Sequence, residues 1–86
     1  MREIAFSAKA KEDLNYWKQT GNRKMQTKIQ ALLASIQQTP FSGIGKPEAL
    51  KHTLSGLWSR RINQEHRLVY EVTDELIKVH SLKGHY

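Results

Sequence analysis

Arginine side chains and one isolated carboxylate form the clearest chemical pattern in the second half of the sequence. Arg61 and Arg67 fall in two adjacent strand-like segments. A guanidinium group binds phosphate through two hydrogen bonds and stays charged at any working pH. Glu48 lies between Lys46 and Lys51, and neighbouring cations favour its ionised form. Such a carboxylate is suited to act as a general base, although an ordinary pairing of Glu48 with a lysine is the alternative.

The last two residues, His85 and Tyr86, add a proton donor and an aromatic ring. A histidine can donate a proton near neutral pH, and a terminal aromatic side chain can stack on a nucleobase. RNA carries its own nucleophile, the 2′-OH group. Its cleavage without a metal needs a base for that proton, cations for the charge on phosphorus and an acid for the departing 5′ oxygen. Glu48, the arginines and His85 match these needs, although a frayed tail without function is the simpler alternative.

Metal and cofactor chemistry is poorly supported by the sequence. The adjacent carboxylates Asp74 and Glu75 fall at an expected hairpin tip, and no pair of His or acidic residues has the spacing of metal ligands. Glycine patterns that bind nucleotide phosphates are also missing, so no cofactor is expected. The remaining histidines are assigned no catalytic role: His52, His66 and His80.

Length and composition limit the class of protein. The chain has 86 residues, so we expect a single domain over residues 1–86 with a small core. It has no Cys, which excludes disulfides and thiolate chemistry and fits a reducing compartment, with the cytoplasm as the default. No apolar run approaches the roughly 20 residues of a membrane-spanning helix, so no membrane partner is expected.

Positive charge is distributed unevenly along the chain. The 14 Lys and Arg residues outnumber the 8 Asp and Glu residues, which gives a formal net charge of +6. No carboxylate lies between Asp13 and Glu48. The cations inside this stretch are Lys18, Arg23, Lys24, Lys28 and Lys46. An acid-free basic surface favours a polyanionic partner, nucleic acid or an acidic protein, whereas a solvated basic helix face is the ordinary alternative.

The elements that must position these groups follow from hydrophobic periodicity. A short strand is expected over 2–6, a first helix begins after Ser7, and a second spans about 23–38. A flexible connector with two glycines follows over 41–47. The last three segments are expected to be strands: 57–62, 67–72 and 76–82. This order predicts an α+β fold in which a helical hairpin lies on one face of a sheet that contains an antiparallel three-strand meander.

The hairpin loop between the first two of these strands decides which arginines share a face. A three-residue loop at 63–65 sets Arg61 opposite Arg67, whereas a two-residue loop would bring Arg60 there instead. The three-residue loop is favoured because it leaves four apolar residues together on the core face: Trp58, Leu68, Tyr70 and Val72.

Two adjacent arginines on the free face of a sheet repel each other. The arrangement therefore predicts a phosphate bound between them. The alternative is that each arginine pairs with a nearby carboxylate such as Glu65 or Glu71.

Three motifs make the chain similar to a known family: TPFSGIGKPEALKH (39–52), LSGLWSRRI (54–62) and EHRLVY (65–70). Together with Tyr16-Trp17 and the terminal His85-Tyr86, they resemble the YoeB/Txe family of bacterial toxins, a branch of the RelE superfamily. The similarity covers nearly the whole chain. One departure is Ala49, because many relatives have Pro there; the change removes a ring next to the glutamate but no chemical group.

The resemblance implies a RelE-like fold and a toxin of a type II toxin–antitoxin system that cleaves messenger RNA on the ribosome and so inhibits translation. It implies Glu48 as general base, Arg67 as the residue that stabilises the phosphorane and His85 as general acid, with Tyr86 near the substrate base. Lys46, Lys51 and Arg61 are expected to support substrate binding. Ribosomal RNA is expected to dock on Lys18, Arg23, Lys24 and Lys28.

The expected partners are the ribosome, messenger RNA and a cognate antitoxin with an acidic, partly disordered segment of the YefM/Axe type. A homodimer also fits the family. The rival interpretation is a non-catalytic toxin of the same fold, either a ParE-like gyrase poison or an RNA-binding protein that blocks the ribosome. A gyrase poison would not be expected to carry the set from Glu48 to His85.

Overall fold

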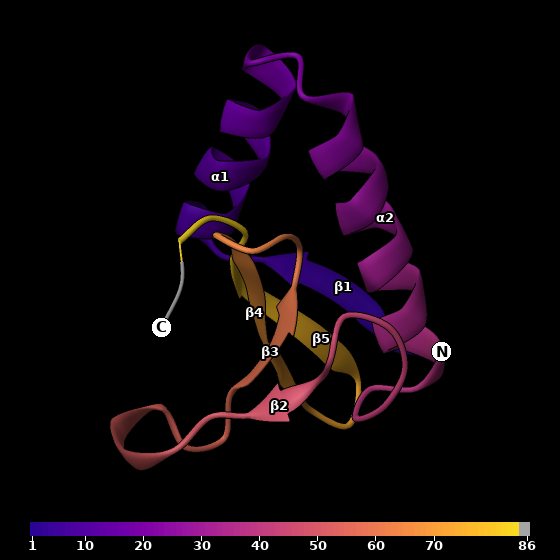
Figure 1. Ribbon diagram of the computed structural model, residues 1–86. Coiled ribbons are helices and arrows are strands. Elements are labelled where there is room, and N and C mark those ends of the chain that lie inside the picture. Colours follow the sequence, from indigo (N-terminus) through magenta and orange to yellow (C-terminus); the bar gives the residue numbers. More distant parts are fainter. Residues whose placement is uncertain (85–86) are drawn as a thin grey trace.

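A five-stranded mixed sheet with two helices on one side is the framework of the chain, whose computed structural model describes residues 1–84 (Figure 1). The elements in chain order are β1 (Glu3–Phe6), α1 (Ala8–Gln19), α2 (Arg23–Gln38), β2 (Glu48–Ala49), the 3-10 turn η1 (His52–Leu54), β3 (Trp58–Arg61), β4 (Arg67–Val72) and β5 (Leu76–Ser81). The strand order is β1-β5-β4-β3-β2, with β1 parallel to β5 and the other neighbours antiparallel. The predicted α+β fold and three-strand meander are confirmed.

Side-chain caps set where both helices begin. The Ser7 hydroxyl accepts a hydrogen bond from the Ala10 amide (3.1 Å), and the Asn22 side chain accepts one from the Met25 amide (3.2 Å). Gly21 lies between the helices with a φ of 68°, a conformation that glycine adopts without a steric penalty. The short turn lets α2 run back in the direction opposite to α1 (Figure 1).

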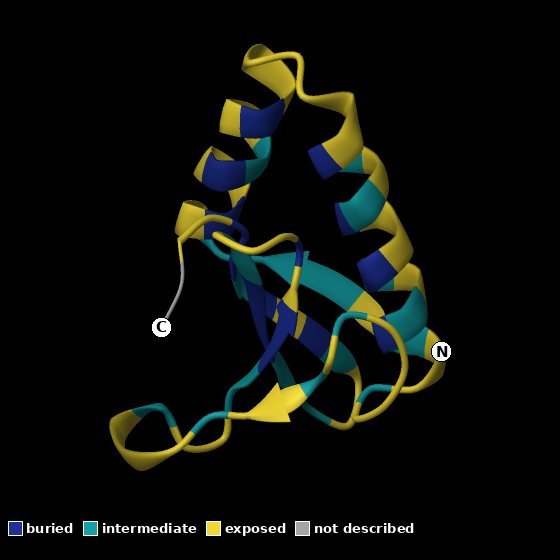
Figure 2. Cartoon of the chain, in the orientation of Figure 1, coloured by how far each residue is buried: buried dark blue, intermediate teal, exposed yellow. Residues whose placement is uncertain are grey.

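Apolar side chains of the helices and of one sheet face form the core (Figure 2). The buried residues of α2 follow the spacing of one helical face: Met25, Ile29, Leu32 and Ile36. The sheet contributes fully buried residues from its two central strands: Leu68, Tyr70, Ile77 and Val79. The core thus lies between the helices and the sheet. Neither helix in this described part of the chain is both long and apolar enough to cross a membrane.

The register of β3 and β4 confirms the predicted three-residue loop. Arg61 is paired with Arg67, and Arg60 is paired with Leu68. The Ile62 amide donates to the His66 carbonyl at 2.9 Å, which closes the loop. Because side chains alternate along a strand, Arg60 is on the helix side of the sheet and Arg61 is on the other side.

One edge of the sheet carries a strand that the sequence did not predict, and the partner of the strand at the other edge was left open. Glu48 and Ala49 form the edge strand β2, which pairs with Ser59 and Trp58 and was not among the expected strands. At the other edge β1 lies beside β5, so the two ends of the sequence are neighbours. Two residues are too few to show a period of two, and periodicity does not specify which strands become neighbours.

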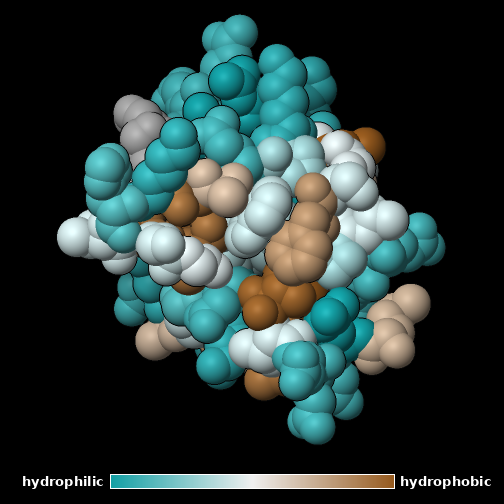
Figure 3. All heavy atoms as spheres, turned by 90° about the horizontal axis from the view of Figure 1, so that it is seen from below, coloured by the Kyte–Doolittle hydropathy of each residue, from teal (hydrophilic) through white to brown (hydrophobic). Residues whose placement is uncertain are grey.

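The connector before β2, which spans 39–47 from the end of α2, is attached to the sheet, in contrast to the flexible segment expected over 41–47 from its glycines. Phe41 and Ile44 of this connector are 53% and 46% exposed. The Phe41 ring contacts the Trp58 ring of β3, with centroids 4.9 Å apart. Figure 3 views the molecule from below and shows hydrophobic side chains at the middle of this face with polar ones around them.

Candidate functional site

Glu48 shares one face of the sheet with Arg61 and Arg67. Glu48 is paired with Ser59, and Ser59 precedes Arg61 by two residues, which places these side chains on the same side. Diagonal neighbours on one face of an antiparallel pair are about 7–8 Å apart, a separation that leaves room for a phosphate group between Glu48 and Arg61. Glu48 is exposed, and within residues 1–84 it forms no ion pair with a lysine.

The two arginines face each other without an acidic partner. Among the described residues no carboxylate lies within ion-pair distance of Arg61 or Arg67. Glu71 contacts His80 at 3.2 Å instead, and Glu65 approaches a histidine of its own turn at 3.9 Å. Two adjacent guanidinium groups on one face repel each other, so an anion placed between them would be stabilised.

The described chain ends beside Arg67. The Arg67 amide donates a hydrogen bond to the Gly84 carbonyl at 2.9 Å. His85 and Tyr86, the acid and the stacking residue expected from the sequence, lie outside the described residues. The chain therefore leads into its last two residues from a point next to Arg67.

Arg60 is fully buried on the opposite face of the sheet and holds the connector that precedes Glu48. Its guanidinium group donates five hydrogen bonds, at 2.7 to 3.1 Å. The acceptors are the carbonyls of Thr39, Ser42 and Ile44 and the hydroxyls of Ser35 and Tyr70. Arg60, considered as an anion ligand from the sequence, is thus a structural residue whose partners are neutral oxygens.

Tyr70 is a second anchor for the connector. Its hydroxyl donates to the Pro40 carbonyl at 2.7 Å. Burial raises the pKa of Tyr70 above its ordinary value of 10.0, while the hydrogen bond and positive charge of Arg60 act in the opposite direction. The hydroxyl therefore stays protonated and available as a donor at neutral pH.

Basic side chains line three shallow hollows that lead from α2 to Arg61. The cations along this path are Lys18, Arg23, Lys24, Lys28 and Lys46. Lys28 belongs to a hollow on α2 and also to one of about 350 Å³ that it shares with Lys46 and Arg61. No carboxylate lines any of the three hollows. The basic helix surface and the arginine face are therefore continuous.

Lys51 follows Glu48 in the sequence and lies near it in the structure. Both residues line a hollow of about 400 Å³ between β2 and η1. No group of three or more His, Cys, Asp or Glu side chains that could hold a metal ion occurs in residues 1–84. The site is thus a carboxylate among cations rather than a cluster of acidic ligands.

Sequence reasoning missed three residues that organise the neighbourhood of the site: Arg60, Asp13 and His66. Asp13 is only 6% exposed, and its spacing from Ala10 and Trp17, which are also buried, was an available signal for an inward-facing carboxylate. Arg60 could be placed by hairpin parity, but its role could not. Nothing in the sequence indicated a contact for His66.

Comparisons with known proteins agree with the geometry. A family model described as the YoeB-like toxin of bacterial type II toxin-antitoxin systems matches residues 6–86. Toxin YoeB of Escherichia coli strain K12 is 46% identical over 84 residues, which cover 98% of this chain and 99% of that protein. The YoeB dimer from Staphylococcus aureus matches with a TM-score of 0.91 and 52% identity, covering 99% of this chain and 98% of that one.

A further solved structure, the YoeB–YefM complex from Staphylococcus aureus, gives a TM-score of 0.89 and 53% identity, with 100% of this chain and 99% of that chain covered. A helical hairpin packed on this mixed sheet places the chain in the class of small RelE-like toxins. More specifically, the chain belongs to the YoeB family of toxins from type II toxin–antitoxin systems. The family resemblance expected from the motifs is confirmed.

Proposed function

We propose that this toxin is a metal-independent endoribonuclease that cleaves messenger RNA on the ribosome and thereby inhibits translation. The observation that carries the proposal is the common sheet face of Glu48, Arg61 and Arg67, together with the hydrogen bond from the Arg67 amide to the carbonyl of Gly84, the residue before His85. This face combines a base with cations that lack a counter-ion among the described residues. It suits a substrate that is a polyanion and brings its own nucleophile.

In the proposed reaction Glu48 accepts the proton of the substrate 2′-OH, and the 2′ oxygen forms a bond to phosphorus. Arg67, supported by Arg61, stabilises the additional negative charge on the phosphorane. The bond from phosphorus to the 5′ oxygen then breaks, and His85 donates a proton to that leaving oxygen. The products are a 2′,3′-cyclic phosphate and a 5′-hydroxyl. Tyr86 stacks on the substrate base in this proposal.

Substrate and ribosome binding follow from the continuous basic path. Lys46 and Lys51 flank Glu48 and contact the phosphates on either side of the scissile bond. Lys28 connects this region to Lys18, Arg23 and Lys24, which dock on ribosomal RNA. Such contacts act through charge and position the enzyme without reading the sequence.

The partner proteins are proposed by analogy with the solved relatives. One Staphylococcus aureus relative forms a YoeB–YefM complex, and another structure is a YoeB dimer. We therefore propose that an antitoxin of the YefM type neutralises this chain by placing an acidic segment on its basic surface, and that the toxin forms a homodimer.

The test is in vitro translation of a defined message with the purified toxin and its Glu48→Gln variant, with new 5′ ends mapped by primer extension. Glu48→Gln keeps the shape of the side chain but removes the base, so the cleavage rate should fall by about 10²- to 10⁴-fold. Glu75→Gln, an equivalent change at the exposed turn before β5, is the matched control and should cleave like the wild type. Cleavage by Glu48→Gln at the wild-type rate would refute the assignment of the base.

The same preparation separates the proposal from its rivals. A ribosome blocker would stall translation without producing new RNA ends, and a gyrase poison would inhibit DNA supercoiling without affecting the message. Cleavage of naked RNA as fast as translated RNA would refute the ribosome dependence. A His85→Ala variant that cleaves like the wild type would refute the assignment of the acid.

A further inference from the structure

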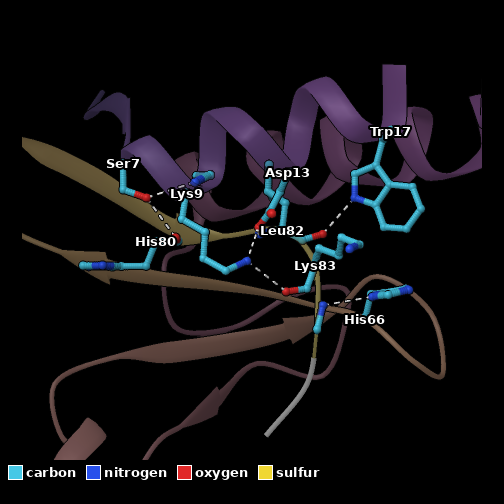
Figure 4. Close-up of polar contacts among 10 residues, drawn as sticks. Ser7, Lys9, Asp13, Trp17, His66, His80, Leu82 and Lys83 are labelled. Atoms are coloured by element: carbon cyan, nitrogen blue, oxygen red, sulfur yellow. Dashed lines mark hydrogen bonds and ion pairs between the residues drawn. The ribbon is translucent and has the colours of Figure 1, made fainter. Parts of the chain in front are cut away.

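The segment before the last two residues is tied to α1 by two buried hydrogen bonds. The Asp13 carboxylate accepts from the Leu82 amide at 2.9 Å, and the Trp17 indole N–H donates to the Leu82 carbonyl at 2.9 Å. Figure 4 shows Asp13 and Trp17 directed toward Leu82, with His66 approaching the segment from the loop between β3 and β4. Both backbone groups of Leu82 are therefore paired.

His66 makes the next contact along this segment. Its Nδ1 atom accepts a hydrogen bond from the Gly84 amide at 2.9 Å. A backbone N–H can only donate, so Nδ1 must carry no proton, and the ring proton of the neutral imidazole is on Nε2. The ring packs edge-on against Trp17, with centroids 4.9 Å apart, and its backbone amide donates to the Asn63 side chain at 2.7 Å. His66 is thus held by Trp17 at its ring and by Asn63 at its backbone.

Gly84 is bonded through both of its backbone groups at the edge of the arginine face. Its amide donates to His66, and its carbonyl accepts from the Arg67 amide at 2.9 Å. Its φ is 98°, and a side chain placed there would meet nothing within 4 Å. Its orientation is therefore set by these two hydrogen bonds rather than by packing around it.

We propose that His66 is a positioning residue that fixes the Gly84 peptide and so sets where the chain enters its last two residues relative to Arg67. The proposal rests on the proposed function in one respect, because His85 is the general acid there. His66 touches no reacting group in this proposal. It acts through Gly84, to which His85 is joined by a peptide bond.

Two neutral amide variants separate this role from simple packing. Asn places its Oδ1 acceptor where His66 has Nδ1, whereas the acceptor of Gln reaches the position of Nε2 and cannot meet the Gly84 amide. His66→Asn should therefore keep the hydrogen bond from the Gly84 amide, called the anchor below, and His66→Gln should lose it. If His66 only fills space against Trp17, the longer Gln side chain should serve at least as well as Asn.

The first measurement is amide hydrogen exchange at Gly84, followed by NMR on the full-length free toxin. Loss of one neutral hydrogen bond should speed this exchange by about 2- to 12-fold in His66→Gln, while His66→Asn stays close to the wild type. His80→Asn is the matched control, because the His80 ring contacts Glu71 and, within residues 1–84, forms no hydrogen bond with residues 82–84, so this change should leave the exchange unchanged. Equal exchange rates in His66→Gln and the wild type would overturn the proposal.

The second measurement is cleavage on the ribosome with kcat and KM determined separately. His66→Gln should lower kcat by a similar factor of about 2 to 12 with KM unchanged, since the substrate contacts remain, and His66→Asn should restore kcat. A rise in KM alone, or a Gln variant as active as the Asn variant, would overturn the positioning role. If the exchange follows the prediction while the wild type itself cleaves no RNA, the anchor is supported and the proposed function is refuted.

Discussion

The connector before β2 and the segment before the C-terminal residues lead to the same sheet face but are held in different ways. The connector (39–47) is attached by Arg60, a side chain with no solvent exposure that donates five hydrogen bonds. The tail segment (82–84) is attached by single hydrogen bonds from separate side chains, and His66 retains 19% side-chain exposure. The connector before Glu48 is thus held by one buried side chain, whereas the tail segment is held by several single contacts, of which the His66 contact is exposed.

The difference follows from the chemistry of the anchors. A guanidinium group has five N–H donors in a rigid plane and keeps its charge in the interior, so one residue can satisfy several carbonyls at once. Asp13, Trp17 and His66 each supply one contact to the tail. Removing a tail contact leaves the others in place, but removing Arg60 removes five hydrogen bonds at once.

The largest expected effect comes from Arg60→Met. This change should lower the free energy of unfolding by about 4 kcal/mol, because it removes the five hydrogen bonds that a fully buried side chain donates to three carbonyls and two hydroxyls. His66→Ala should lower it by only about 1 to 2 kcal/mol, since it loses one exposed hydrogen bond and one edge-on ring contact with Trp17. Urea denaturation of the free toxin measures both values.

Arg61→Met is the matched control for this comparison. Arg61 neighbours Arg60 but is exposed, so its replacement should change the unfolding free energy by no more than about 0.5 kcal/mol. Similar losses for Arg60→Met and Arg61→Met would show that the connector is not supported by the core.

The same contrast explains what could be predicted from the sequence. The helices, the meander and the pairing of Arg61 with Arg67 follow from local periodicity and loop length, which are properties of neighbouring residues. The role of Arg60 depends on carbonyls 16 to 21 residues away, and the contact of Gly84 with His66 joins residues 18 apart. Contacts of this kind depend on the tertiary structure and leave no periodic signal.

For the candidate site, residue type was more informative than position. A lone carboxylate among lysines pointed to Glu48, but the edge strand that brings it beside β3 has two residues and no pattern of its own. The charge of Arg60 suggested an anion ligand equally well, and only its place on the helix side separates it from Arg61. Sequence therefore indicated the candidate residues of this face more readily than the framework that brings them together.

The next largest effect compares two glycines with similar backbone conformations. Gly45 in the connector has a φ of 83° and Gly84 in the tail a φ of 98°, so alanine is strained at both. At Gly45 an added Cβ would also lie 2.6 Å from a Leu32 methyl carbon and 3.1 Å from the Arg60 Cβ. Gly45→Ala should therefore lower the free energy of unfolding by about 3 kcal/mol, and Gly84→Ala should lower it by about 1 kcal/mol. Urea denaturation measures both values.

Equal losses at the two glycines would contradict the comparison, because backbone strain alone would then account for both. Gly56→Ala provides a reference, since Gly56 has a φ of 97° and a Cβ added to it would meet nothing within 4 Å. The unfolding free energy lost in Gly56→Ala should match that lost in Gly84→Ala within about 0.5 kcal/mol.

The smallest effect is a pH dependence that belongs to the connector. The pKa of Tyr70 is raised by burial, so above pH 10.0 the unfolded chain loses the phenol proton while the folded protein retains it. Stability from this group is complete below pH 10.0 and falls as the pH rises toward the folded pKa, by at most about 1.4 kcal/mol per pH unit. Tyr70→Phe lacks this dependence, so its stability deficit relative to the wild type should narrow between pH 10 and 11.

His66→Ala tests whether the alkaline loss is specific to the connector. It keeps the Tyr70 hydroxyl and its bond to Pro40, so its deficit relative to the wild type should stay constant over the same alkaline range. Urea midpoints measured at quarter-unit pH intervals would show both trends. If the stability deficit relative to the wild type narrowed equally in the two variants, the loss of stability at alkaline pH would arise elsewhere in the chain. The buried Tyr70 hydroxyl would then not be the group that titrates.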